Sequence, residues 1–228
     1  MTRKPFGFGN RSSSGPFYRP YRQDSINHIY NLLFCDDPAL YRNGRQQGAL
    51  AEVLSQTATR ETLERIGNDP DAESRVRVLA FNRLRAMNAP VPSRHLLGAI
   101  IEVPQDNGLD VLAVFDDKRL RYINQSENVA VFEDTPPHIT AKARALLRHA
   151  QTAVNQTGSS DQPRRPPPRG DVARLTFLVS DGLYFGEGDY DVLIEDPMAA
   201  PILGTASELL VMVVEAALEN RQDRALPH

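Results

Sequence analysis

The sequence predicts an α+β fold: a mainly antiparallel sheet, made of a four-strand meander plus a hairpin, with helices on one face and an N-terminal helical lobe. Apolar residues follow a helical spacing up to about residue 90, then alternate with a period of two over four short segments. A helical stretch, a second strand pair and a last helix follow, an order typical of α+β domains. With 228 residues, 41% hydrophobic and 24% charged, the chain has the size and composition of one globular domain.

Residues 1–23 are predicted to form a disordered tail. Its first 22 residues hold five basic and no acidic side chains, so the rest of the chain, whose total charge is −3, carries −8. Frequent Gly, Pro and Ser prevent a periodic apolar face, while aromatic residues alternate with arginines. Three alternatives stay open for Phe17, Tyr18 and Tyr21: an arm that is solvated or packs on its own acidic body, an arm for a protein partner, or an arm for nucleic acid.

Residues 24–90 are predicted to form the helical lobe. Asp24 or Ser25 is placed to cap its first helix, and Pro38 prevents that helix from continuing. Helical spacing of apolar residues predicts three helices, over residues 25–34, 59–66 and 71–87. Four arginines of the third helix lie mostly off its apolar stripe and are interpreted as a solvated face: Arg75, Arg77, Arg83 and Arg85.

An α+β sandwich is predicted over residues 91–220. The strong turn signal Asn107-Gly108 separates the first two strands of the meander. The four strands are expected over residues 97–103, 109–115, 120–124 and 128–133. Because a meander usually buries one face, a helix over residues 139–154 is expected to cover it.

A polar loop over residues 157–170 contains the run Arg-Arg-Pro-Pro-Pro-Arg and is interpreted as a stiff spacer rather than as a ligand of aromatic-grooved domains. Strands over 172–179 and 183–185 follow, then a helix over 201–220 and a flexible end, 221–228. The middle of that helix is apolar nearly all round, which predicts packing on more than one side or a subunit contact.

The sequence predicts no metal, no cofactor and no assigned catalytic residue. Cys35 is the single cysteine, which excludes an intramolecular disulfide and a zinc site built on several thiolates. The neighbouring Asp36 and Asp37 disfavour its thiolate, so we interpret Cys35 as a small buried hydrophobe at a helix end. No apolar run approaches about 18 residues and no export signal is recognisable, so we expect a cytoplasmic protein without membrane contact.

Two polar sets are the candidate ligand- or partner-binding residues. Ser180, Asp181 and Tyr184 lie in a glycine-rich segment, 179–188, between apolar strands, where glycine permits close approach of a ligand to the backbone. The competing interpretation is a hairpin turn followed by a glycine bulge. On the third strand, period-two alternation puts Tyr122 and Asn124 on the face opposite to Arg121.

Four segments of the chain resemble an uncharacterised group of soluble bacterial proteins, a resemblance that covers about residues 71–210. They are 73–77 (ESRVR), 108–113 (GLDVLA), 121–125 (RYINQ) and 175–188 (LTFLVSDGLYFGEG). The resemblance implies a soluble bacterial protein and brings no activity, cofactor or substrate. The order of the predicted elements is similar to that of profilin-like and roadblock- or longin-like scaffolds, which bind partners more often than they catalyse.

Two functions are therefore expected. The first is a non-catalytic cytoplasmic binding or adaptor protein that acts through protein–protein contacts, with a protein partner or as a homo-oligomer. The alternative is an enzyme or small-ligand-binding protein that uses the Ser180–Gly188 hairpin, with Asp181 as an acid or base and Tyr184 as a hydrogen-bond donor. Nucleic acid enters only as a partner of the basic tail.

Overall fold

The computed structural model describes residues 15–44 and 46–225, apart from the side chains of 43 and 220–225, and has the predicted α+β class with its N-terminal helical lobe. The helices are α1 (Asp24–Leu32), η1 (Pro38–Asn43, a 3-10 helix), α2 (Gly48–Leu54), α3 (Arg60–Asn68), α4 (Ser74–Ala86), α5 (Pro137–Gln156), α6 (Tyr190–Leu193) and α7 (Ala200–Ala225). The strands are β1 (Leu96–Gln105), β2 (Gly108–Phe115), β3 (Leu120–Ile123), β4 (Val129–Phe132), β5 (Val172–Val179) and β6 (Gly182–Asp189). Three of these elements, η1, α2 and α6, are not predicted from the sequence.

The six strands form one antiparallel sheet in the order β4-β3-β2-β1-β5-β6. The predicted meander and hairpin are joined through β1, which pairs with β2 on one side and β5 on the other. Strand β6 is longer than predicted, and it pairs with β5 without a register shift from Gly182 to Asp189. The prediction of a glycine bulge there is wrong, because Gly186 and Gly188 lie opposite Leu175 and Ala173 in regular pairing.

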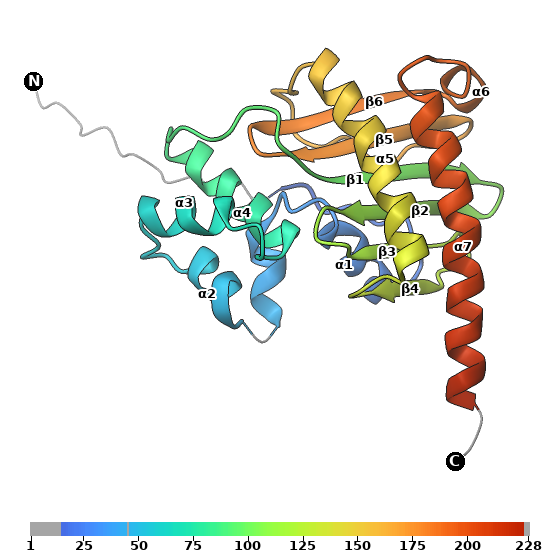
Figure 1. Cartoon of the computed structure of the whole chain (residues 1–228), viewed down its shortest axis with the longest axis horizontal. Helices are drawn as coiled ribbons and strands as arrows, with labels where there is room; N and C mark the ends of the chain where they lie inside the picture. The colour runs from blue at the N-terminus through green and yellow to red at the C-terminus, as the bar shows by residue number, and fades with distance from the viewer. Residues whose placement is uncertain (1–14, 45, 226–228) are drawn as a thin grey trace, which may run out of the picture.

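Both faces of the sheet are covered (Figure 1). Helices α5 and α7 pack on one face, where residues such as Leu112, Leu175 and Leu209 form one apolar core. The helical lobe covers the other face, where Tyr30 and Phe81 belong to a second core. Successive side chains of a strand point to opposite faces of the sheet, so they belong to different cores. Leu112 lies in the core under α5 and α7, and its neighbour Val111 lies in the core under the helical lobe.

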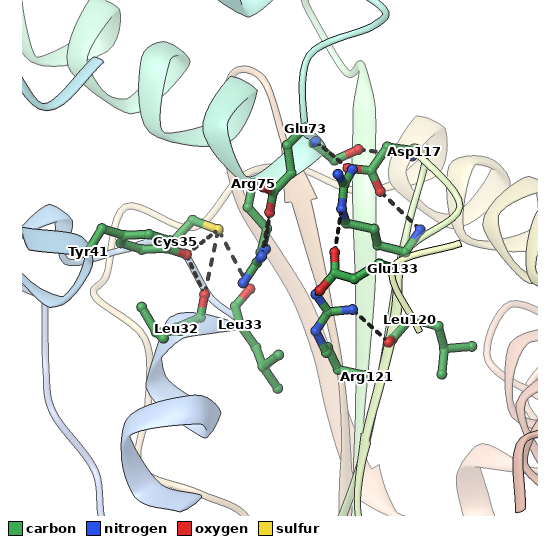
Figure 2. A network of polar contacts seen from close by, with 12 residues as sticks. Leu32, Leu33, Cys35, Tyr41, Glu73, Arg75, Asp117, Leu120, Arg121 and Glu133 are labelled. Carbon is green, nitrogen blue, oxygen red and sulfur yellow. Dashed lines mark hydrogen bonds and ion pairs between the residues drawn. The ribbon is translucent and has the colours of Figure 1, made fainter. Parts of the chain in front are cut away.

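The loop between β2 and β3 fixes the start of α4. The side chain of Glu73, the N-cap residue of α4, accepts no hydrogen bond from the first turn of the helix. The side chain of Asp117, in the turn between β2 and β3, takes that place (Figure 2). The backbone N–H of Ser74 donates to Asp117 Oδ2 at 2.7 Å, and the N–H of Asp117 donates to Ser74 Oγ at 3.1 Å. Arg119 Nη1 donates to the same carboxylate oxygen at 2.9 Å. The turn therefore joins the lobe to the sheet.

Replacing Asp117 is expected to destabilise the protein. The change Asp117→Ala leaves the N–H of Ser74 without its acceptor at a helix N-terminus, and we expect a loss of about 1–2 kcal/mol in the free energy of unfolding. Urea denaturation of the variant measures it. The control is Asp116→Ala, because the Asp116 side chain is 54% exposed and its ion pair with Arg77 is long, at 3.9 Å. Equal losses in the two variants would contradict the capping role.

The described part of the N-terminal tail packs on its own body, unlike the predicted disordered arm. Tyr21 is 7% exposed, and its hydroxyl donates to Leu109 O at 3.0 Å. The N–H groups of Arg22 and Gln23 each donate to the carboxylate of Glu127 at 2.9 Å. The expectation of disorder is therefore wrong for residues 15–23, and the alternative of an arm that packs on its own acidic body holds there. Its first part, residues 1–14, lies outside the described residues.

Helix α7 runs to Ala225, into the end that was predicted to be flexible. The buried ones among its described side chains lie between 202 and 213 and belong to the core under α5: Ile202, Leu203, Ala206, Leu209 and Val213. By length and composition alone, the segment Ala200–Glu219 is long and apolar enough to cross a membrane, which the sequence analysis did not recognise. Within the fold, 33% of the most apolar 18 residues of that segment is buried.

Candidate functional site

A groove of about 1110 Å³ lies on the surface of the helical lobe. We call it the arginine groove, because three arginines contribute to its wall. Its lining residues are Asp36, Pro38, Arg42, Val53, Leu54, Ser55, Gln56, Ala58, Leu79, Asn82, Arg83, Arg85, Ala86 and Met87. They come from η1, α2 and the C-terminal half of α4, with the segments that join them.

Two of the arginines are held in place by hydrogen bonds to carbonyl and amide oxygens. Arg83 Nη1 donates to Val53 O at 2.5 Å and to Ser55 O at 2.6 Å, at the C-terminal end of α2, where the helix dipole favours a cation. Arg85 donates from Nη1 to Ser180 O at 2.7 Å and from Nη2 to Asn82 Oδ1 at 2.8 Å. The interpretation of the α4 arginines as a solvated face is therefore wrong for Arg83 and Arg85. It is wrong for Arg77 as well, which is 6% exposed and donates from Nε to Gly67 O at 3.0 Å.

The positive charge of the groove is not balanced by ion pairs. Within the described chain, no carboxylate lies within salt-bridge distance of Arg42, Arg83 or Arg85. Burial, and then the neighbouring charge of Arg42, lowers the pKa of Arg83. Burial lowers the pKa of Arg85 as well, against the opposing effect of Asp181. The groove therefore presents three cationic groups next to apolar side chains such as Met87, which is 49% exposed.

A second hollow, of about 540 Å³, adjoins the groove and shares Asp36, Asn82 and Arg85 with it. Its other wall is formed by the loop 159–164 and the turn between β5 and β6. Three of its lining residues have a buried atom without a hydrogen-bond partner in the described chain: Asp36 Oδ1, Asp181 Oδ1 and Arg164 Nη1. The wall of this hollow therefore includes one cation and two carboxylates, each with a buried polar atom that lacks a partner among the described residues.

Arg164 anchors the loop that was predicted to be a spacer. Its side chain is 2% exposed, and Nε donates to Asp36 Oδ2 at 2.7 Å. Nη2 donates to Asn31 Oδ1 at 2.8 Å and to Pro16 O at 2.7 Å. The guanidinium carbon lies over three aromatic rings, 4.0 Å from the centroid of Phe34, 4.9 Å from Tyr18 and 5.6 Å from Tyr30.

A buried carboxylate lies beyond these rings. Tyr30 Oη donates to Glu102 Oε1 at 2.6 Å, and Glu102 is 0% exposed at the centre of β1. Its nearest cation is Arg174, whose Nη1 lies 3.9 Å from Glu102 Oε2. Arg174 itself forms a closer pair with Glu187, at 2.8 Å. Burial raises the pKa of Glu102, and the hydrogen bond from Tyr30 and the charge of Arg174 oppose that rise.

Cys35 lies at the end of α1 in a different polar cluster (Figure 2). It is fully buried, its sulfur is 3.3 Å from Tyr41 Oη, and that hydroxyl donates to Leu32 O at 2.5 Å. Burial raises the pKa of the Cys35 thiol to about 12. A thiol with this pKa is protonated at neutral pH, which agrees with the interpretation of Cys35 as a buried hydrophobe.

Among the predicted residues of the 180–188 hairpin, Ser180 is fully buried and structural. It donates from Oγ to Pro92 O at 2.5 Å and accepts from the N–H of His95 at 3.2 Å. Asp181 Oδ2 accepts from the N–H of Arg94 at 2.9 Å. Tyr184 is 3% exposed in the core under α5, and burial and then the Asp181 carboxylate raise its pKa. Only Asp181 lines the hollow.

The other predicted residues lie elsewhere. Tyr122 donates to Asp110 Oδ2 at 3.2 Å on the α7 side of the sheet, and Asn124 Oδ1 accepts from the N–H of Asn128 at 2.9 Å in the β3–β4 turn. Phe17 is 41% exposed beside Arg19, while Tyr18 and Tyr21 bond to the body. The structure therefore does not gather these residues into one site.

No group of three or more His, Cys, Asp or Glu side chains in the described parts of the chain is placed to hold a metal ion. Comparisons of the chain with models of known families, with curated proteins and with solved structures find no match.

Proposed function

We propose that the protein is a non-catalytic binding protein whose arginine groove holds an acidic segment of a partner protein. The observation that carries the proposal is the set of three arginines, Arg42, Arg83 and Arg85, without a carboxylate partner in the described chain, along an open groove of about 1110 Å³. Arginine recognises carboxylates through paired N–H donors, and Arg and Met are enriched at protein interfaces.

A protein segment fits this surface better than nucleic acid. Apolar residues with accessible surface lie beside the arginines of the groove, among them Pro38, Ala86 and Met87, and none of its described lining residues is aromatic. Single-stranded nucleic acid is held by stacking on aromatic rings, and duplexes are held by many phosphate contacts. A peptide that alternates acidic and apolar side chains would satisfy both components of the wall.

Selection of random short peptides displayed on phage tests the proposal. We expect the selected pool to be enriched in Asp and Glu together with Leu, Ile or Val, and we expect binding of a fluorescein-labelled selected peptide to weaken as salt concentration rises. The variant Arg42→Gln is expected to weaken binding about fivefold, the equivalent of about 1 kcal/mol for one partly exposed charge pair.

The control is Arg169→Gln, because Arg169 is exposed and lies outside the groove. It should leave the affinity unchanged. A pool without acidic enrichment, equal weakening by both variants, or tighter binding of a single-stranded oligonucleotide than of the selected peptide would overturn the proposal.

A further inference from the structure

Helix α7 has a second apolar stripe, on the side that faces away from the core. Its largest members are exposed: Val211 by 58%, Val214 by 39% and Leu218 by 53%. Toward the N-terminus the same stripe continues through the exposed Gly204 and Ser207. The spacing of these positions alternates between three and four residues, which is the repeat of helices that pack side by side.

The stripe is suited to close packing along its whole length. A Cβ built on Gly204 meets no atom within 4 Å, so the surface there is open. Ser207 Oγ donates to Leu203 O at 3.0 Å, so its hydroxyl is satisfied inside the helix. The helix also continues past the β4 edge of the sheet, where no strand lies beneath it (Figure 1).

We infer that this stripe binds the same stripe of a second copy of the chain, with the two α7 helices antiparallel across a twofold axis near Val211. The side chains of the stripe are small at its N-terminal end, at Gly204 and Ser207, and large at its C-terminal end, at Val214 and Leu218. An antiparallel pair places the small end of each helix against the large end of the other, as an isologous interface requires.

Charge supports a second copy as the occupant. Among the α7 side chains that the structure describes, the exposed charged ones are acidic: Glu208, which pairs with Lys142 of α5 in the same copy, Glu215 and Glu219. The neighbouring helix α5 exposes Arg144 and Arg148, which have no ion pair in the described structure. Because α5 and α7 lie side by side on one face (Figure 1), a twofold pair brings the basic row of each copy toward the acidic helix of the other.

Sedimentation equilibrium over a range of protein concentrations tests the inference. The wild-type chain should sediment as a dimer, and Val211→Glu should sediment as a monomer with an unchanged circular dichroism spectrum. The matched control is Val192→Glu, which puts the same charge on a valine that is 64% exposed on α6. A monomeric wild-type chain at every concentration, or the same mass for both variants, would overturn it.

Cross-linking gives a second measurement. Cys35, the natural cysteine, is fully buried, so a cysteine placed at residue 211 is the reactive thiol. Mild oxidation should join two copies of Val211→Cys and should not join copies of Val192→Cys. If the wild-type chain is monomeric and floats with phosphatidylcholine vesicles while Val211→Glu does not, the stripe binds a lipid surface and the inference is wrong.

Discussion

Replacing Arg164 by methionine is expected to lower the free energy of unfolding by about 3–5 kcal/mol, which corresponds to a fall of about 10 °C in Tm for a chain of this size. The side chain keeps most of its bulk, but Asp36 loses the guanidinium that accounts for its 2.7 Å ion pair. Burial already raises the pKa of Asp36 against the charge of Arg164, so an unpaired carboxylate is left in a poorly solvated site. The bonds to Pro16 O and Asn31 are lost as well.

Two further variants separate the charge effect from lost packing. In Arg164→Met combined with Asp36→Asn, the buried charge is gone, so we expect part of the stability to return. In Arg165→Met, the neighbouring arginine is 53% exposed and pairs with Glu187, so we expect a loss of less than about 1 kcal/mol. Urea or guanidinium denaturation measures all three. A loss in Arg164→Met no larger than in Arg165→Met would show that the buried contacts contribute little.

Glu102→Gln is expected to stabilise the protein at neutral pH, by about 2 kcal/mol. Glutamine keeps an oxygen for the hydrogen bond from Tyr30, and Arg174 keeps its closer partner Glu187, while the cost of a buried charge disappears. Burial raises the pKa of Glu102 in the folded state. Below the unfolded pKa of about 4.3 both states hold the proton, and above it the unfolded state releases the proton first, so this carboxyl destabilises the fold increasingly as pH rises.

The measurement is the difference in free energy of unfolding between Glu102→Gln and the wild type, from about pH 4 to about pH 8. Burial raises the pKa of Asp36 and Asp110 in the same direction, but their contributions are common to both proteins and cancel in the difference. Tyr30→Phe is the complementary variant, because it removes a hydrogen bond that lowers the pKa of Glu102 and should therefore steepen the loss of stability with rising pH. If the difference in free energy of unfolding between Glu102→Gln and the wild type did not change with pH, the pKa of Glu102 would not be raised by folding.

The sheet and its covering helices were predictable because their signals are local. Alternation with period two, the Asn107-Gly108 turn and the helical spacing over 139–154 each depend on residues close together in the sequence. The same local signals placed α1, α3, α4 and α7. They are weak for η1 and α2, because six and seven residues are too few to show a helical repeat of apolar positions, and no element was predicted over 38–54.

The candidate site was not predictable for a related reason. Helical spacing puts Arg83 on the edge of the apolar stripe of α4 and Arg85 off it. It does not show that η1, α2 and the segment 159–164 lie beside these arginines, and two of these three segments lack a recognisable signal. Arg164 lies in a run of prolines whose composition is typical of a spacer. The aromatic rings and the Asp36 carboxylate that contact Arg164 are far from it in the sequence, so the composition around Arg164 gives no sign of them.

The contacts of Arg164 also constrain when the chain can finish folding during its synthesis. Its bonds to Asp36, Asn31 and Pro16 span 128, 133 and 148 residues of sequence. A ribosome-bound chain that ends before Arg164 has emerged therefore carries the Asp36 carboxylate without its counter-ion, however complete its helices are. Because contacts of long sequence separation form slowly, the helical lobe is expected to reach its final packing only after most of the sheet has been made.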